Sequence, residues 1–409
     1  MSVSEDVLLR PAEAVARPRG LAARALRLAG LIRSGELTLI LPDGSVHRVI
    51  GDRPGPSATV RLASLRAVRR FAFGGSLGWA EAWLDGDWTT PDLRAVMALA
   101  AANEQEWRRV LNGRPLVRLI SRLAHRLRPN TRRGAKRNIA AHYDLGNDFY
   151  AAWLDSTLTY SSAEFADPAA ESLEEAQRRK VRNLIAALEL APGARILEIG
   201  CGWGFLAETA AREFGLSAVA ITLSREQHAY AAARIAAAGL ADRVEVRLQD
   251  YRDVRGSFDG IVSCEMFEAV GERYWPAFFR TVHDRLRPGG RAALQVIAIA
   301  DRFFDDYRRG ADFIQRHVFP GGMLPSPGRL RTEVARAGLV WRSDTWFGAS
   351  YAETLARWHE RFRAAWPRLA ASGRHDERFR RLWEYYLLYC ETGFRAGWID
   401  VGRIVLARA

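Results

Sequence analysis

The chain has 409 residues, of which 48% are hydrophobic and 26% charged, so it is long enough for two domains with sizeable cores. No apolar run reaches the roughly eighteen residues that a membrane-spanning helix needs, so we expect none. The net charge of +13, carried almost entirely by arginine, favours an acidic partner such as nucleic acid or an anionic membrane surface.

Residues 1–20 are expected to form a flexible tail. They contain Glu5, Asp6 and Glu13 and no apolar stretch, so they do not resemble a signal peptide and we expect a cytoplasmic protein. The only cysteines are too few and too scattered for a disulfide framework or a zinc cluster: Cys201, Cys264 and Cys390. No metal is expected.

Residues 21–105 predict a small α/β domain. Leu37–Leu41 and Ser45–Ile50 are β-rich and flank the turn Pro42-Asp43-Gly44, which indicates a hairpin. Helical periodicity follows over Trp79–Leu84 and Leu93–Ala101.

Residues 106–137 are expected to form a basic linker. From Trp107 to Tyr143 the chain has no Asp or Glu and eleven Arg or Lys, and apolar residues recur at helical spacing between Leu116 and Leu127. Such a basic amphipathic helix can lie on an anionic bilayer. An interdomain helix with a solvated arginine face would give the same pattern.

Residues 138–409 alternate between β-rich and helical segments, which predicts a parallel sheet with helices on both faces. The helical segments include Leu173–Leu190, Ser224–Ala238 and Tyr274–Leu286. The expected strands number seven: Ala194–Ile199, Ser217–Thr222, Arg243–Leu248, Phe258–Ser263, Arg291–Ala298, Leu339–Asp344 and Val401–Ala407.

A glycine loop follows the first of these strands in the sequence Glu198-Ile199-Gly200-Cys201-Gly202-Trp203-Gly204. A dinucleotide loop would carry its third glycine one position later and an acid at the end of the second strand, which here ends Ile221-Thr222-Leu223. A Gly-Lys-Ser/Thr motif for phosphate is also absent. The loop instead resembles the S-adenosylmethionine loop of doubly wound, Rossmann-like class I methyltransferases.

Several longer stretches resemble the cyclopropane-fatty-acid synthase and mycolic acid cyclopropane synthase family. Gly75–Leu93 resembles the N-terminal domain of the longer bacterial synthases. The other stretches are Asn138–Asp148, Leu158–Ser162, Leu197–Gly204, Ile221–Gln227, Ser263–Gly271, Phe313–Ser326 and Phe394–Asp400. The resemblance implies an α/β fold in which a seven-stranded methyltransferase domain follows a smaller α/β domain.

The resemblance also implies a set of site residues. For the S-adenosylmethionine site they are Tyr160, Ser161, Gly200, Gly202, Gly204, Thr222, Leu223, Gln227, Tyr251 and Arg252. In this family an alkene attacks the sulfonium methyl group, and a bound bicarbonate takes a proton from the resulting carbocation. The matching bicarbonate positions are Ser162, Glu268, Gln295, the Ile297 backbone and Tyr351. Cys390 matches a family cysteine sometimes assigned to the active site, although methyl transfer to an alkene needs no covalent nucleophile.

Three positions depart from the common family pattern. Ser162 replaces a cysteine, Gln295 a histidine, and Ala269 the histidine that often follows the glutamate. Plant-type members carry Ser and Gln at the first two positions, and both side chains can hydrogen-bond an anion. The outcome therefore stays open between a cyclopropane ring and a methyl or methylene branch.

The leading hypothesis is an enzyme that transfers a methylene or methyl group from S-adenosylmethionine to the double bond of an unsaturated phospholipid acyl chain. We expect it to work peripherally at the inner membrane surface, and a homodimer is left open. Rivals are an RNA methyltransferase, a small-molecule N-methyltransferase and a non-enzymatic lipid-surface subunit. We find no RNA-binding module and expect no nucleic-acid partner.

Overall fold

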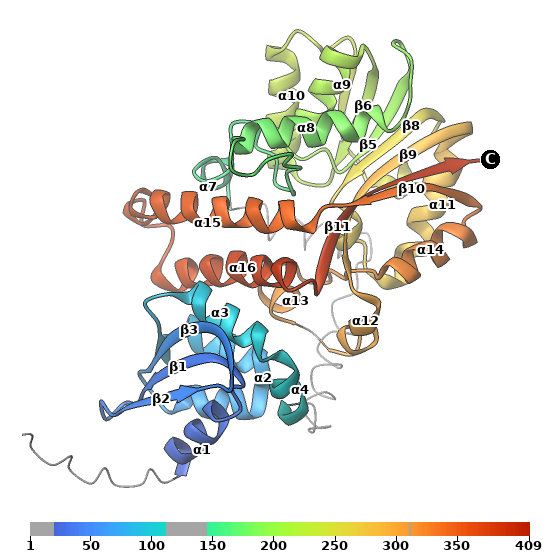
Figure 1. Cartoon of the computed structure of the whole chain (residues 1–409). Helices are drawn as coiled ribbons and strands as arrows, with labels where there is room; N and C mark the ends of the chain where they lie inside the picture. The colour runs from blue at the N-terminus through green and yellow to red at the C-terminus, as the bar shows by residue number, and fades with distance from the viewer. Residues whose placement is uncertain (1–19, 112–144, 311) are drawn as a thin grey trace, which may run out of the picture. The chain divides into compact units, whose positions relative to one another are not determined.

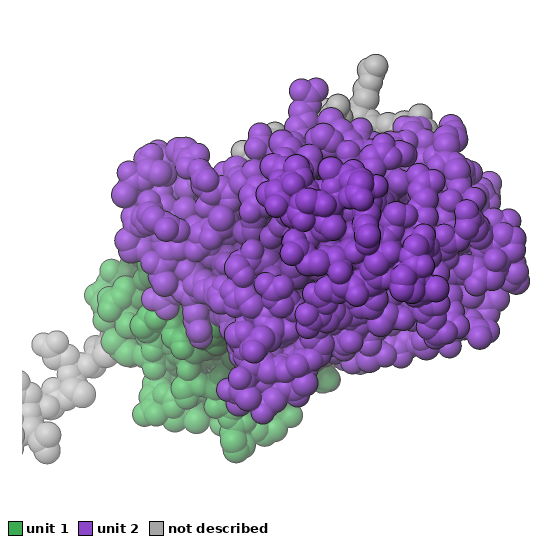
Figure 2. All heavy atoms as spheres, turned by 90° about the horizontal axis from the view of Figure 1, so that it is seen from above, with its two compact units in different colours: residues 1–111 green, residues 112–409 purple. Residues whose placement is uncertain are grey.

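The computed structural model describes residues 20–111, 145–310 and 312–409. The chain divides into two compact units, residues 1–111 and 112–409, which Figure 2 colours separately. The expected tail (residues 1–20) lies almost wholly outside the described residues, as does the basic amphipathic helix between Leu116 and Leu127. Among the described helices, none is both long and apolar enough to cross a membrane.

The first unit is a four-stranded sheet with helices. Its sheet has the order β2-β1-β3-β4, and the expected hairpin is confirmed, since β1 pairs antiparallel with β2 from Glu36 opposite Ile50 onward. The side chain of Asn103 accepts hydrogen bonds from the Arg33 and Ser34 amides at 2.7 and 2.9 Å, which ties the end of α3 to the start of β1. The elements are α1 (Gly20–Ala29), β1 (Ser34–Ile40), β2 (Val46–Ile50), β3 (Arg53–Leu62), α2 (Arg66–Leu84), β4 (Trp88–Thr89), α3 (Leu93–Ala102) and α4 (Glu104–Leu111).

The second unit is built on a seven-stranded sheet with the order β10-β11-β9-β8-β5-β6-β7. All seven expected strands are confirmed. The strands β5 to β9 run parallel, whereas β11 is antiparallel to both of its neighbours. Their bounds are β5 (Arg195–Ile199), β6 (Ser217–Thr222), β7 (Val244–Leu248), β8 (Phe258–Cys264), β9 (Leu286–Ile299), β10 (Leu339–Trp346) and β11 (Ile399–Arg408).

Helices cover both faces of this sheet (Figure 1). One core joins the sheet to α8 (Leu173–Ala186), α9 (Phe205–Phe214) and α10 (Arg225–Ala237). The other joins it to α11 (Trp275–Arg285) and α14 (Pro327–Arg336). β5 and β6 are buried along almost their whole length, and strands that are covered on both faces favour apolar side chains in both directions.

The remaining helices lie beyond the carboxyl edge of the parallel strands. The long helices α15 (Gly348–Ala371) and α16 (Glu377–Arg395) run side by side (Figure 1). Short elements complete the unit: α7 (Asn147–Ala151), η1 (Tyr251–Asp253), η2 (Phe267–Ala269), η3 (Glu272–Tyr274), α12 (Asp301–Tyr307) and α13 (Phe313–His317). These segments supply the aromatic side chains of the site.

Candidate active site

The glycine loop leaves β5 with its backbone in the left-handed region, where glycine avoids steric strain. The φ angles are 86° at Gly200, 52° at Gly202 and 86° at Gly204. A Cβ atom at Gly200 would lie 2.8 Å from Met266, and one at Gly204 would lie 3.0 Å from Ala231, whereas one at Gly202 would meet nothing within 4 Å. Packing therefore requires the outer two glycines, and the middle one leaves open space in which a ligand can approach the backbone.

The ends of β6 and β7 lie next to this loop in the sheet. Thr222 donates a hydrogen bond from its hydroxyl to the Gln227 side chain at 3.0 Å, and Leu223 lies between them in the turn. After β7, the Arg252 guanidinium donates to both carboxylate oxygens of Asp250, at 2.8 and 2.6 Å, and stacks 5.5 Å from the Tyr251 ring. These residues hold one another in place at the sheet edge where such folds bind nucleotides.

A buried lysine, which the sequence patterns did not single out, joins the site from α8. Lys180 is 1% exposed, and its Nζ donates to Ser161 Oγ at 2.6 Å and lies 3.5 Å from Cys264 Sγ. Burial raises the pKa of Glu198 to about 8, and the charge of Lys180 opposes this shift. A signal was available, because Lys180 is one of only two lysines in an arginine-rich chain.

Glu265 is the second residue that the sequence reasoning missed. Its Oε1 accepts hydrogen bonds from the Ser162 amide at 2.8 Å and the Gln295 side chain at 2.7 Å, and its Oε2 accepts from the Tyr351 hydroxyl at 2.7 Å. Three of the positions expected to hold an anion therefore converge on this carboxylate. The available signal was a second acid three positions before Glu268, in the stretch Ser263–Gly271.

Glu268 lies on η2 beside this group. Its Oε1 accepts a hydrogen bond from the Ile297 amide, and its Oε2 has no hydrogen-bond partner in the part of the chain that the structure describes. Burial first, and the charge of Glu265 second, raise the pKa of Glu268 to about 8. Glu265 and Glu268 are half-buried as whole residues, whereas the Glu268 Oε2 atom is enclosed by protein.

Aromatic rings pack near Tyr351, whose hydroxyl donates to Glu265. Tyr351 packs against Phe394 with ring centroids 4.5 Å apart, and Tyr160 shares a hydrogen bond of 2.9 Å with Tyr386. Cys390 lies on the same helix as Tyr386, and burial raises the pKa of its thiol, so it stays protonated and is a poor nucleophile.

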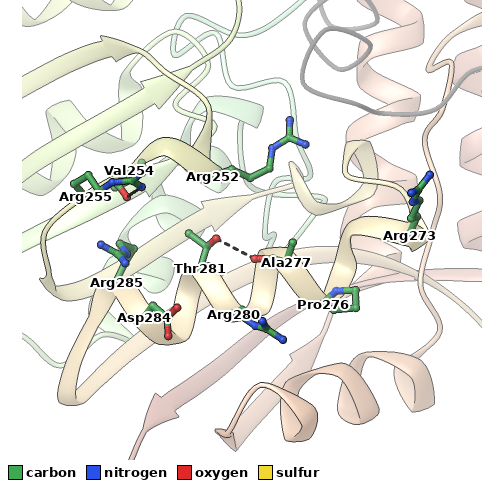
Figure 3. A pocket seen from close by; sticks show the side chains of 10 residues that line it. All are labelled: Arg252, Val254, Arg255, Arg273, Pro276, Ala277, Arg280, Thr281, Asp284 and Arg285. Atoms are coloured by element: carbon green, nitrogen blue, oxygen red, sulfur yellow. Dashed lines mark hydrogen bonds between the residues drawn. The ribbon is translucent and has the colours of Figure 1, made fainter.

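A separate hollow lies outside this group of residues (Figure 3). Arg280, Thr281 and Asp284 of α11 line it, and the Thr281 hydroxyl donates to the Ala277 carbonyl at 2.9 Å. Of the expected site residues, this hollow includes only Arg252. The acids and the glycine loop thus form a site distinct from it.

The family model for mycolic acid cyclopropane synthetase matches residues 130–404. The chain belongs to this family. It is 39% identical over 390 residues to the tuberculostearic acid methyltransferase of Mycobacterium tuberculosis, an alignment that covers 91% of this chain and 88% of the relative. It is 35% identical over 353 residues to the cyclopropane-fatty-acyl-phospholipid synthase of Escherichia coli, covering 86% and 88%.

Solved structures of family members agree with the fold. The cyclopropane synthase MmaA2 from Mycobacterium tuberculosis matches with a TM-score of 0.62 and 30% identity, over 67% of this chain and 98% of that one. Mycolic acid cyclopropane synthase CmaA1, complexed with SAH and CTAB, also has a TM-score of 0.62 and 30% identity, over 66% and 97%. The fold is that of class I methyltransferases, and the protein is an S-adenosylmethionine-dependent enzyme of this family.

The residues present fit S-adenosylmethionine but not bicarbonate. The open space at Gly202 and the polar ends of β6 and β7 suit the cofactor. The expected bicarbonate positions, by contrast, already have carboxylate partners: the Ser162 amide, the Gln295 side chain and the Tyr351 hydroxyl donate to Glu265, and the Ile297 amide donates to Glu268. A second anion in that place would face a carboxylate at hydrogen-bond range, and like charges in a buried site repel strongly.

Proposed function

We propose that the enzyme transfers a methyl group from S-adenosylmethionine to the double bond of an unsaturated fatty acyl chain in a phospholipid, and that a cyclopropane ring then closes. The observation that carries the proposal is the buried carboxylate held by Ser162, Gln295 and Tyr351, beside a glycine loop with room for the cofactor. The names of two relatives support it: one in Escherichia coli is a cyclopropane-fatty-acyl-phospholipid synthase, and one in Mycobacterium tuberculosis is a tuberculostearic acid methyltransferase.

The chain's own groups meet the demands of this chemistry. Bound S-adenosylmethionine supplies an electrophilic methyl group. An alkene is a weak nucleophile, so the protein must orient it and exclude water. The faces of Tyr351 and Phe394 can stabilise a transient positive charge, and an anion at the Ser162–Gln295–Tyr351 group takes up the released proton.

A methyl or methylene branch is the second candidate product. It is favoured by the 39% identity to a tuberculostearic acid methyltransferase over 91% of this chain. The products differ in how the cation is quenched. A ring closes when the transferred methyl group loses a proton and its carbon bonds to the cationic carbon. A methylene branch forms when a hydride first shifts to the cationic carbon and the methyl group then loses the proton, and proton loss from a neighbouring chain carbon leaves a methyl branch beside a new chain double bond. The N-methyltransferase alternative has a neighbour, coclaurine N-methyltransferase, with 17% identity, which shows the fold alone.

We also propose that the enzyme works peripherally at the inner, anionic membrane surface. The support is the net charge of +13 and the run of eleven basic residues between Trp107 and Tyr143. Flotation with vesicles checks this: binding to phosphatidylglycerol vesicles should fall as salt rises, and equal binding to phosphatidylcholine vesicles would contradict it.

The decisive experiment incubates purified protein with S-adenosylmethionine and vesicles of monounsaturated phospholipid, and analyses the fatty esters by mass spectrometry. A product that gains one carbon and two hydrogens and resists hydrogenation is a ring. The same gain in mass with a double bond that hydrogenation removes is a methyl- or methylene-branched chain. Vesicles of saturated phospholipid serve as the control, and no product from any unsaturated lipid would refute the proposal.

A further inference from the structure

Glu265 occupies the place of an anionic ligand. All three of its donors come from segments far away in the sequence: Ser162 from the loop before α8, Gln295 from β9 and Tyr351 from α15. Together they satisfy both carboxylate oxygens. Donors gathered in this way around one carboxylate form a site built to hold a negative charge.

The backbone supports the same conclusion. Glu265 adopts a φ of 49°, in the left-handed region that a residue with a side chain rarely enters. Its backbone amide donates to the Gln295 carbonyl at 2.8 Å, and its carboxylate accepts from the Gln295 side chain. Gln295 therefore holds both the backbone and the side chain of the strained residue. Such strain persists only where surrounding contacts determine it, and it is often found at functional sites.

We propose that the Glu265 carboxylate is the base of the reaction and takes the place of bicarbonate, so that the enzyme needs no added anion. This inference rests on the proposed function. The alkene electron pair forms a bond to the sulfonium methyl carbon while the old carbon–sulfur pair stays on sulfur, which leaves a cation on the chain. Glu265 then takes one proton from the new methyl group, and the freed carbon–hydrogen pair closes the ring. The neutral acid finally releases its proton to water.

The electrostatics divide two roles between the neighbouring acids. Burial raises the pKa of Glu265, but the charge of Lys180 and the hydrogen bonds from Tyr351, Ser162 and Gln295 all favour its ionised form. Glu268 has no such set of donors, and its pKa of about 8 keeps it protonated at neutral pH. Glu265 thus has the charged and hydrogen-bonding partners that favour a carboxylate, and Glu268 lacks them, as in sites where a base lies beside a neutral acid.

The first test compares three variants in bicarbonate-free buffer. The wild-type rate should not change when bicarbonate is added. Glu265→Gly should lose activity by about 10²- to 10⁴-fold, as expected for a lost base, and recover in part with bicarbonate, because the donors are then free. Glu265→Gln should lose as much and not recover, because its amide fills the same space. The matched control is Glu189→Gly, at another glutamate with positive φ (51°), which pairs with Arg291 and should behave as wild type.

The second test needs neither cofactor nor lipid. The ¹³C NMR resonance of labelled bicarbonate should broaden when the Glu265→Gly protein is added, because the ion binds to it. The resonance should stay sharp with the wild type, Glu265→Gln and Glu189→Gly. Bicarbonate binding to wild type, bicarbonate-dependent wild-type activity, or full activity of Glu265→Gln would each overturn the inference.

The two tests separate the two proposals. If no lipid is modified by any variant, the proposed function fails, while the NMR result still decides whether Glu265 excludes bicarbonate. If Glu265→Gly does not fold, two results still test the inference: the wild-type activity should not depend on bicarbonate, and Glu265→Gln should lose activity.

Discussion

Gln295 holds Glu265 by both its main chain and its side chain. The Gln295 carbonyl accepts the Glu265 amide at 2.8 Å, and the Gln295 amide group donates to the Glu265 carboxylate at 2.7 Å. One residue of β9 therefore fixes both the backbone turn after β8 and the direction of the carboxylate. A histidine at this position, as in many family members, would replace the side-chain amide donor by a ring nitrogen.

Gln295→Met should shift the pH dependence of activity. Loss of the amide removes a hydrogen bond that lowers the Glu265 pKa, so this pKa rises and the carboxylate forms only at higher pH. The acid limb of the kcat/KM profile should move upward, and stability should fall by about 1–3 kcal/mol because buried groups lose a partner. Glu189→Gly serves as a surface control. An acid limb that stays at the same pH in Gln295→Met would contradict the role of Gln295 in lowering the Glu265 pKa.

Glu268→Gln should flatten the dependence of stability on pH. In the folded protein the Glu268 carboxyl keeps its proton up to about pH 8, whereas in the unfolded chain it loses the proton above about pH 4.5. The buried neutral carboxyl therefore stabilises the folded state fully below pH 4.5, and this stabilisation is lost as the pH rises through 8. The amide cannot titrate, so in that window the slope of the unfolding free energy should become shallower by up to about 1.4 kcal/mol per pH unit. Urea denaturation at several pH values measures it, and identical slopes would refute the buried neutral acid.

Gly202→Ala should weaken cofactor binding more than it weakens the fold. The new methyl group would meet no protein atom within 4 Å, but it would enter the space left for S-adenosylmethionine. We expect Kd for S-adenosylmethionine to rise about tenfold or more, a loss of about 1.4 kcal/mol in binding. Gly193→Ala is the matched control, since Gly193 also has positive φ and open space around its Cα, but precedes β5. Equal affinities of both variants, by calorimetry, would argue against cofactor contact at Gly202.

Cys390→Ala should retain the wild-type rate. Burial raises the pKa of all three thiols, Cys201, Cys264 and Cys390, so none is a ready thiolate at neutral pH. Native protein should therefore react slowly with iodoacetamide, and unfolded protein rapidly. Loss of activity in a folded Cys390→Ala variant would restore a catalytic role for this residue.

The architecture could be predicted from the sequence because the signals that specify it are local. β-rich runs such as Arg195–Ile199 and Ser217–Thr222, separated by helical segments, indicate a parallel sheet covered on both faces. The Gly200-x-Gly202-x-Gly204 loop likewise marks the first strand end, since glycine adopts positive φ angles without steric strain. These features depend on residues a few positions apart.

Only the tertiary structure decided which acid the anion-binding donors face. Glu265 and Glu268 lie three residues apart after the same strand, and the family pattern directs attention to Glu268 alone. The backbone of Glu265 has a positive φ, and its carboxylate accepts hydrogen bonds from residues 162, 295 and 351. No local sequence pattern specifies these long-range contacts. Lys180 shows the same limit: on a helix with mostly charged neighbours it resembles a surface residue, yet packing places its ammonium group in the interior, against Ser161. The direction of a side chain after a strand end is set by long-range packing, which a linear sequence does not display.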